Sequence, residues 1–352
     1  MKNQSMRRWP AEWEPHKATW MAWPCRQEIW THGIERAHRA FADVANTISE
    51  FEPVHMLIRT EDASVAQKLL SSDIELHFYA LNDSWARDIA PLWVKESLVE
   101  ESLVEESLAE ESLSNGEDSS TAPLALDFLF NAWGNKFTPY AHDAKVAEHI
   151  SQLSQTKREA HDFVLEGGAI HGNGAGTLLT TEECLLNQNR NPRLDKNTIE
   201  QRLLQAFGAK EVIWLKNGLA GDVDTDGHID NIACFVDEKT IITQSTADTH
   251  SENHTIYADN KAIIKDGGFE LIKIAEPEPR YSDGVRVPLS YINYYIANDI
   301  VVLPSFGCKQ DEQAFSVMKD LYPSRQVKQI DANEILVGGG GIHCITMQQP
   351  LI

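Results

Sequence analysis

The stretch KNTIEQRLLQAFGAKEVIWL, residues 196–215, decides the fold class, because an amphipathic helix in it is followed by a short apolar strand. The same order occurs five times along the 352 residues. Helices are expected at 35–51, 142–154, 196–207, 253–265 and 310–321. The apolar runs that follow them are Val54–Ile58, Phe163–Leu165, Val212–Leu215, Leu271–Ile274 and Gln326–Ile330.

Further strands are expected between these helix–strand pairs, which makes each repeat a ββαβ module. They are Ile74–Tyr79, Ile89–Val94, Thr177–Thr180, Ile232–Val236, Ile241–Thr243, Ile300–Leu303 and Ile335–Val337. Five such modules favour a closed radial α/β arrangement over an open parallel sheet. Because no linker rich in proline, glycine or serine interrupts the chain, a single domain spanning 1–352 is expected.

An acidic repeat lies between the first two expected helices. Residues 96–115 read ESLVE, ESLVE, ESLAE and ESLSN, and the biased segment extends to about residue 120. A five-residue period matches neither a helix nor a strand, so we expect a surface insert without a direct function. An acidic docking segment for a basic partner is the alternative.

Charge and cysteine usage exclude several classes of protein. The net charge is −22, and residues 96–118 hold nine acids and no lysine or arginine. Such a chain is repelled by nucleic acid and by anionic membranes, whereas a small cationic substrate is compatible with it. The five cysteines contain no C-x-x-C pair, which argues against a disulfide framework and a thiolate zinc cluster. Without a signal-peptide or membrane-spanning pattern, we expect a cytoplasmic protein.

Four segments place acids, histidines or a cysteine where a strand meets a loop. They are NDSWARDIAP (82–91), FVLEGGAIHGNG (163–174), GDVDTDGHIDNIACF (221–235) and ILVGGGGIHCITMQQP (335–350). In the first, Asp83 is a turn former, and Arg87 with Asp88 is open to interpretation as a surface pair. In the second, Glu166 ends a strand beside two glycines that permit close approach of a ligand, although a bulged strand is the simpler explanation.

The third segment alternates acids with other residues. If the backbone is extended there, His228 and Asp230 lie on one face of the sheet. The opening D-x-D-x-D-G resembles a calcium loop, but Ala233 stands where such a loop needs glutamate. A metal pair formed by His228 and Asp230 together with Asp88 stays open as an alternative.

The fourth segment carries four glycines before Ile-His-Cys. Such a run is costly in conformational entropy unless the backbone needs close approach. We expect Cys344 at a loop-to-strand junction with a partly exposed thiol, although cysteines are most often buried and inert. His343 would point away from Cys344 in an extended strand and is interpreted as structural.

The four segments together combine a thiol, a histidine and more carboxylates than a catalytic triad needs. A thiol nucleophile requires deprotonation, a proton carrier and an electrophile. Carboxylates in excess suit a cationic electrophile, and two of them can grip the planar guanidinium group through its N–H donors.

This combination resembles the agmatine deiminases of the guanidine-modifying superfamily, which are similar to peptidyl-arginine deiminases. The shared motifs are WPAEWEPH, NDSWARD, FNAWG, LEGGAIH, TEECLLNQNRNP, GDVDTDGHIDN and GGIHCITMQQP. They cover nearly the whole chain except the acidic repeat. The resemblance implies a five-bladed α/β propeller with its site at the central axis.

By this resemblance, Cys344 is the nucleophile that forms a covalent amidino-cysteine with the guanidinium carbon. His228 protonates the departing ammonia and then activates water, while Asp88 and Asp230 hold the guanidinium nitrogens. The implied products are N-carbamoylputrescine, which belongs to putrescine biosynthesis, and ammonia. The resemblance implies no cofactor and no metal, and it suggests a homo-oligomer.

Glu166 resembles an additional acid that orients His228 or touches substrate, and Trp85 resembles an aromatic flanking the substrate. Two positions depart from the usual motifs, since related sequences read G-G-N-I-H-C and I-T-Q-Q-Q-P where this chain has Gly341 and Met347. The loss of an asparagine at 341 is expected to change hydrogen bonding beside the cysteine.

Two groups of alternatives remain at this point. Relatives in the same superfamily act on arginine or peptidyl-arginine. Free arginine carries an α-carboxylate that needs an arginine side chain as its partner, and Arg190 and Arg193 are the candidates. A metal-dependent hydrolase built on Asp88, His228 and Asp230 is the alternative from a different class.

Overall fold

The five expected helices are all present in the computed structural model, which describes residues 4–99, 121–282 and 284–352. They are α1 Ile34–Ser49, α5 Val146–Leu153, α7 Lys196–Phe207, α8 Asn253–Asp266 and α9 Gln310–Leu321. Local signals set the ends of α7: Asp195 accepts a hydrogen bond from the Thr198 backbone N–H at 2.8 Å, and Gly208 stops the helix with φ +64°. No helix in the described part of the chain is long and apolar enough to cross a membrane.

Five units share one strand pairing: the first strand is antiparallel to the second, and the second is parallel to the third across a helix. The unit around α5 contains β5 Leu92–Val99, β6 Thr121–Leu129 and β7 Lys157–Val164, and the unit around α7 contains β8 Ile170–Gly172, β9 Thr177–Thr181 and β10 Glu211–Leu215. The unit around α8 contains β11 Ala233–Phe235, β12 Thr240–Ser245 and β13 Glu270–Ala275, and the unit around α9 contains β16 Tyr295–Ala297, β17 Ile300–Ser305 and β18 Gln326–Asp331. The unit around α1 contains β19 Thr346–Pro350, β2 His16–Ala22 and β3 Val54–Ile58. The last unit joins the end of the chain to its beginning.

Smaller elements extend this framework. Strands β1 Gln4–Arg8 and β4 Glu75–Phe78 add to β5 and β3, and β14 Tyr281–Ser282 pairs with β15 Val285–Arg286. Helix α2 spans Ala63–Leu69. The one-turn helices are α3 Ala86–Ile89, α4 Ala132–Asn135, α6 Glu182–Leu185 and α10 Asn333–Leu336.

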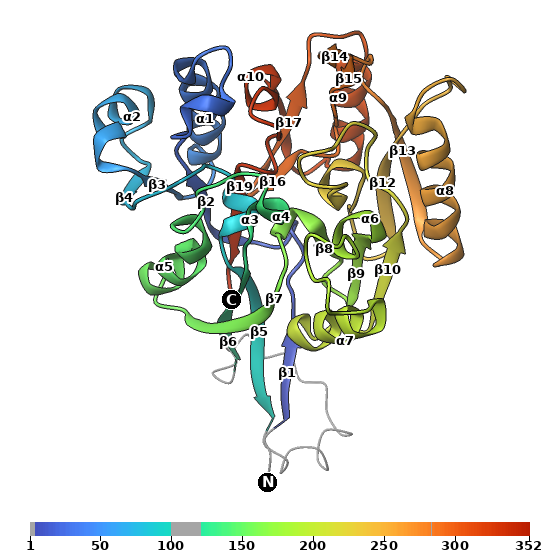
Figure 1. Cartoon of the computed structure of the whole chain (residues 1–352), viewed down its shortest axis with the longest axis horizontal. Coiled ribbons are helices and arrows are strands. Elements are labelled where there is room, and N and C mark those ends of the chain that lie inside the picture. The colour runs from blue at the N-terminus through green and yellow to red at the C-terminus, as the bar shows by residue number, and fades with distance from the viewer. Residues whose placement is uncertain (1–3, 100–120, 283) are drawn as a thin grey trace.

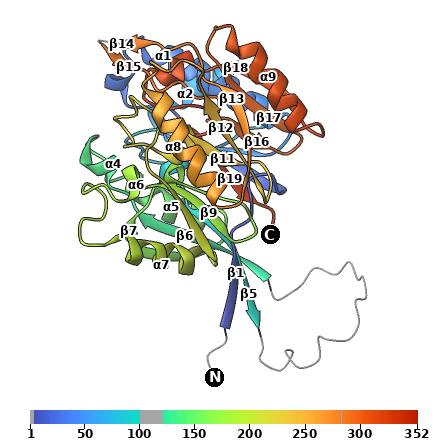
Figure 2. The ribbon, with the colours of Figure 1, turned by 90° about the vertical axis from the view of Figure 1, so that its right-hand side faces the viewer.

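The long helices lie on the outside of the molecule, and short elements lie near its centre. In Figure 1, α1, α9, α8, α7 and α5 are at the periphery, whereas β19, α3 and β16 are central. Helix α1 buries Phe41, Val44 and Ile48 completely, which is what its amphipathic pattern predicts. Figure 2 shows β1 and β5 extending together from the body. The fold is therefore α/β with mixed sheets, as expected.

Three expected strands are wrong in part or in whole. Residues 335–337 lie in and just after α10, not in a strand, and Ile89 ends α3, so the strand expected at 89–94 begins at Leu92. Short apolar runs do not distinguish a buried strand from one turn of helix, which explains both errors. The strand expected at 163–165 is instead the mostly polar β7, because its solvent-facing residues break the apolar run.

The acidic repeat also begins differently from the expectation. Its first residues, 96–99, belong to β5 and pair with β1, while 100–120 lie outside the described residues. Glu96 accepts hydrogen bonds from the Arg7 guanidinium at 3.1 and 3.2 Å, and the same guanidinium binds Glu159. The first copy of the repeat therefore contributes the end of strand β5.

Two deletions test this division of the repeat. Removing 101–115 keeps one ESLVE copy for β5, so the melting temperature and turnover should stay at wild-type values. Removing 96–115 also removes the Glu96 partner of Arg7, so it should lower the melting temperature. Thermal unfolding of both variants beside the intact chain is the measurement, and equal melting temperatures for the two deletions would contradict the assignment of 96–99 to β5.

Candidate active site

Each of the five units contributes polar groups from the segment that enters its first strand. Asp88 precedes β5 by four residues and Glu166 precedes β8 by four. His228 and Asp230 precede β11, Asn293 precedes β16 and Cys344 precedes β19. The repeated topology therefore brings sequence-distant residues into one buried place.

Cys344 lies at the loop-to-strand junction that was expected, but its side chain is buried, with only 5% of the residue exposed. The Asn293 side-chain N–H donates to Sγ at 3.1 Å, and Sγ lies 3.6 Å from Asp230 Oδ2. Burial, then the charges of Asp230 and Asp88, raise the pKa of the thiol well above its ordinary value; the Gly341 N–H and Asn293 oppose this. The free thiol is therefore protonated at neutral pH.

His343 contacts residues of the site, contrary to the orientation inferred from the sequence. Residues 342–345 form a turn, so His343 does not point away from Cys344 as it would in a strand. Its Nδ1 lies 2.9 Å from Asp230 Oδ2, and its Nε2 lies 3.0 Å from Glu12 Oε1. Both nitrogens face carboxylates, so the ring donates two hydrogen bonds when it is protonated.

The charges along this chain of contacts reinforce one another. Burial and Arg87 would lower the pKa of His343, but Glu12 and the hydrogen bond to Asp230 outweigh them and the pKa is raised. Burial would raise the pKa of Asp230, but His343 outweighs it and the pKa is lowered. Arg87, expected as half of a surface pair, is instead buried and 3.0 Å from Glu12. Asp230 is thus held as a carboxylate.

Asp88 has no cationic hydrogen-bond partner among the described residues. Its two oxygens accept from the Gly168 N–H and the Trp133 indole N–H, each at 2.9 Å. His228 Nδ1 lies 3.9 Å from Asp88 Oδ1, beyond hydrogen-bond distance, and neither ring nitrogen of His228 is bonded. Burial, with the charges of Asp230 and Glu166, raises the pKa of Asp88. One carboxylate and one imidazole are therefore free to receive a ligand.

A glycine permits this close grouping. A Cβ atom at Gly168 would lie 2.6 Å from His228 Nδ1 and 3.0 Å from oxygens of both Asp88 and Asp230. His228 and Asp230 are not on an extended strand as expected, because residues Ile229–Asn231 form a 3₁₀ turn. The turn, not strand alternation, places the two side chains.

Glu166 is completely buried beside a cation that the sequence interpretation did not pair with it. The Arg190 guanidinium donates to Glu166 at 2.6 Å and to Asp226 at 2.7 Å, so Arg190 is already neutralised. The second oxygen of Glu166 has no hydrogen bond, and one of its oxygens lies within 4.8 Å of a His228 ring nitrogen. Proximity to His228 agrees with one of the two expected roles.

The arrangement does not favour the proposed metal set. Ligand atoms of Glu166, Cys184 and His228 lie within 4.8 Å of one another, but those of Asp88, His228 and Asp230 do not form such a group. The adjacent Arg190 charge also disfavours a cation beside Glu166. The residues present do not fit the catalytic ion that the metal-dependent alternative needs.

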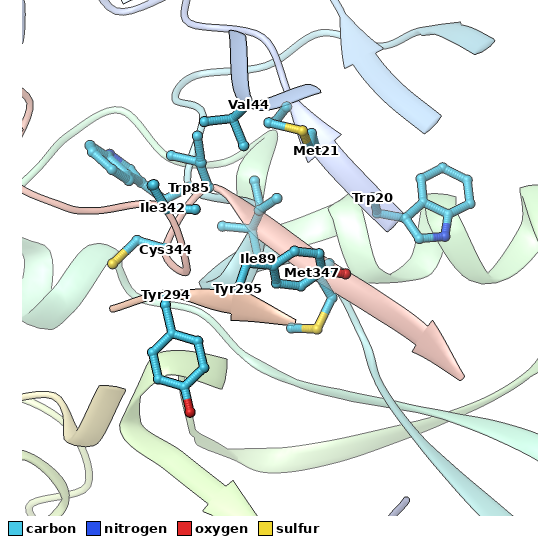
Figure 3. Close-up of a cluster of buried hydrophobic side chains, with 14 of the residues drawn as sticks. Trp20, Met21, Val44, Trp85, Ile89, Tyr294, Tyr295, Ile342, Cys344 and Met347 are labelled. Atoms are coloured by element: carbon cyan, nitrogen blue, oxygen red, sulfur yellow. The ribbon is translucent and has the colours of Figure 1, made fainter. Parts of the chain in front are cut away.

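The four glycines before the cysteine are needed for close approach, as the sequence indicates. A Cβ atom at any of residues 338–341 would lie 2.3–2.7 Å from a neighbouring side chain. Gly340 makes room for the Trp85 ring, which also lies 5.9 Å from the Trp30 ring centroid. Figure 3 shows Trp85 and Ile342 on one side of Cys344, with the sulfur pointing away from the apolar cluster.

A narrow cavity of about 20 Å³ reaches the thiol. The residues that line it are Ile29, Asp83, Trp85, Asp88, Trp133, Phe137, Asp224, Thr225, Gly338, Gly339, Gly340 and Cys344. No lysine or arginine is among these described lining residues. Asp224 is a further acidic group in the cavity wall. Burial and the neighbouring Asp222 raise its pKa. Aromatic and acidic surfaces of this kind suit a slender cation.

Asn293 was not predicted from the sequence. Besides donating to Cys344, its Oδ1 accepts from the His343 backbone N–H at 2.9 Å. A Cβ atom at Gly341 would lie 2.3 Å from that oxygen, so glycine at 341 is what admits Asn293. The other departure, Met347, places its sulfur 3.6 Å from an Arg87 nitrogen. The only signal in the sequence was an asparagine inside the apolar run YINYY.

Comparisons with known proteins agree with this geometry. Residues 8–350 match the model of the Porphyromonas-type peptidyl-arginine deiminase family. The agmatine deiminase of Medicago truncatula is 36% identical over 373 residues, covering 97% of this chain and 96% of that protein. A cysteine-to-serine variant of the C. jejuni agmatine deiminase with substrate bound superposes with TM-score 0.87 at 29% identity, covering 99% and 98% of the two chains. The Enterococcus faecalis agmatine deiminase gives TM-score 0.85 at 29% identity, covering 98% and 96%.

The match over nearly the whole chain shows that this protein belongs to the Porphyromonas-type peptidyl-arginine deiminase family.

Proposed function

We propose that the protein is an agmatine deiminase, which hydrolyses agmatine to N-carbamoylputrescine and ammonia. The observation that carries the proposal is the buried Cys344 thiol in a cavity whose ionisable lining groups are carboxylates. A guanidinium is the electrophile that such a cavity would attract. The relatives that are named agmatine deiminases support the same substrate.

The bound guanidinium activates the thiol in this proposal. Asp88 and Asp230 would accept hydrogen bonds from the guanidinium nitrogens and hold the central carbon in line with the sulfur. The cation would offset the carboxylate charges that raise the pKa of Cys344, and the thiol would lose its proton. Sγ then attacks the guanidinium carbon and forms the C–S bond of a tetrahedral adduct.

His228 would carry the protons of both half-reactions. Its unbonded ring would take the proton that the Cys344 thiol loses and give it to the departing nitrogen, so the C–N bond breaks and ammonia leaves. The same ring then takes a proton from water, whose oxygen attacks the amidino-cysteine carbon. The C–S bond breaks, the sulfur recovers a proton, and the ureido product remains. Glu166 would orient His228, and Trp85 would flank the substrate chain.

The cavity favours agmatine over arginine. Free arginine carries an α-carboxylate, which needs a cationic partner when it is buried. The lining instead presents Asp224, whereas Asp83 is already paired with Arg26 at 2.9 Å. Arg190 is bound to Glu166 and Asp226, and Arg193 lies on the surface. The ammonium end of agmatine suits the Asp224 carboxylate. Arginine and peptidyl-arginine remain the alternatives within the family.

We also infer that the five units close into a five-bladed propeller within one catalytic domain. The pairing of the last strand, β19, with the second strand, β2, supports a ring that joins the two ends of the chain. A crystal structure whose units repeat about one axis near Cys344 would be the direct test. The five free cysteines support a cytoplasmic location. The proposed product, N-carbamoylputrescine, supports a place in putrescine biosynthesis. The homo-oligomer stays a proposal that light scattering can test.

The substrate is tested by ammonia release from agmatine, arginine and a blocked arginine peptide. Agmatine should be hydrolysed, with kcat/KM for arginine at least about a hundredfold lower because of its unpaired carboxylate. Cys344→Ala should lower turnover of agmatine by roughly 10³-fold or more. Cys308→Ala removes a half-buried thiol outside the cavity and should keep full activity. Faster turnover of arginine, or an active Cys344→Ala, would contradict the proposal.

The raised thiol pKa is tested by alkylation with iodoacetamide. Because the folded pKa lies well above 9.0, the thiolate fraction at Cys344 should still rise with pH at pH 9. In urea the pKa returns to the ordinary value of about 8.5, so the rate should be half-maximal near that pH and level off above it. Mass spectrometry of the labelled peptide follows Cys344 alone, and saturating agmatine should block the reaction. A plateau below pH 8 in the folded enzyme would show a preformed thiolate instead.

The role of the Asn293 amide beside the sulfur is tested by removing it and by supplying an amide from position 341 instead. Asn293→Ala removes a donor to a group that becomes charged, so kcat/KM should fall roughly 10- to 150-fold and the alkylation profile of Cys344 should move to higher pH. Gly341→Asn alone should also be impaired, because its Cβ meets Asn293. The double variant, with Asn293→Ala and Gly341→Asn, should recover part of both losses. Additive losses in the double variant would contradict the exchange.

A further inference from the structure

A second cluster of ligating side chains lies on two neighbouring strands, away from the cavity. His55 lies on β3, and Glu75 and His77 lie on β4. The strands are parallel, with His55 opposite Glu75 and Leu57 opposite His77. Alternate residues of a strand share one face, so all three side chains project from the same face of the sheet.

The three side chains converge through single ring nitrogens. His55 Nδ1 and His77 Nε2 are 3.0 Å apart. Glu75 Oε2 lies 3.3 Å from His55 Nδ1, and Glu75 Oε1 lies 3.7 Å from His77 Nε2. In a tetrahedral zinc site with bonds of about 2.0–2.2 Å, ligand atoms are about 3.3 Å apart. One ligand atom from each of the three residues lies within 4.8 Å of the other two, so small side-chain shifts would bring them to three corners of such a site.

A buried aromatic ring holds the two imidazoles in place. The Trp20 ring stacks on His55 with centroids 4.5 Å apart, and lies 5.3 Å from the His77 ring. Trp20 is itself fixed by a 2.9 Å hydrogen bond from its indole N–H to Gln349. In Figure 3, Trp20 lies on the opposite side of the view from Cys344. The cluster is thus preorganised and separate from the proposed chemistry.

We propose that His55, Glu75 and His77 bind one divalent transition-metal ion of the zinc class. Two imidazoles and one carboxylate suit borderline ions such as Zn²⁺ or Co²⁺, whereas Mg²⁺ and Ca²⁺ prefer oxygen ligands. The Glu75 side chain is 64% exposed, which leaves the fourth corner open to water. An ion here joins β3 to β4, the edge strand of its sheet, so its effect is on stability rather than on catalysis.

Cobalt binding to the full-length protein tests the site. Protein stripped with EDTA is titrated with Co²⁺ while visible absorption and bound metal after gel filtration are measured. One ion per chain is expected, with four-coordinate bands and no thiolate-to-cobalt charge transfer. A thiolate band would put the ion on a cysteine and overturn the proposal, as would the absence of binding.

Variants identify the ligands. His55→Ala and His77→Ala should each weaken binding at least roughly tenfold. Glu75→Gln should also weaken it, and because that side chain is exposed the fold should survive. His32→Ala is the matched control, since His32 also contacts a carboxylate, Glu334 at 3.2 Å. Unchanged binding in His77→Ala would show that the two rings form only a hydrogen-bonded pair.

The stability readout separates binding from damage to the fold. The metal-loaded wild type should melt at a higher temperature than the same protein in EDTA. In Glu75→Gln and His77→Ala the difference should shrink or vanish, while melting in EDTA stays near that of the wild type. A metal-dependent shift of full size in both variants would overturn the proposal.

Discussion

Buried negative charge around one thiol is the constraint on which the rest of the site depends. A carboxylate is costly to bury unless a cation or hydrogen bonds compensate it. Glu166 is compensated by Arg190 and Asp230 by His343, but Asp88 receives only neutral N–H donors. Burial first, and then the charges of Asp230 and Asp88, raise the pKa of the thiol, so in the proposed mechanism a bound cation would offset these charges. The charge of the substrate is in this sense part of the machinery.

The repeated unit explains how so many charged groups reach one place. In every unit the first strand begins a few residues after a polar side chain, and the helix of that unit lies on the outside of the molecule (Figure 1). The helices and inner strands supply the apolar packing, so the entry segments are free to hold one-turn helices and glycines. Asn293 completes this pattern. It comes from the unit that begins with β16, for which the sequence had predicted no site residue.

Periodicity predicted the framework well, because an amphipathic helix such as α1 has one face that must be buried. The site was predicted as a set of residues, since Asp88, His228, Asp230 and Cys344 do meet. Their local conformation was not predicted, because alternation assumes an extended backbone and both histidine segments are turns. That assumption is why His343 was assigned away from the cysteine.

The exchange at position 341 shows why a motif alone misjudges a hydrogen bond. Related sequences usually carry asparagine there, and its replacement by glycine suggests a lost amide beside the thiol. In this chain the Asn293 oxygen occupies the space in which a side chain at 341 would begin, 2.3 Å from the Cβ position. Asn293 in this place and any side chain at 341 therefore exclude one another. An amide is present beside Cys344, but the segment that precedes β16 supplies it. The three-dimensional contact therefore shows a compensation that the motif alone does not.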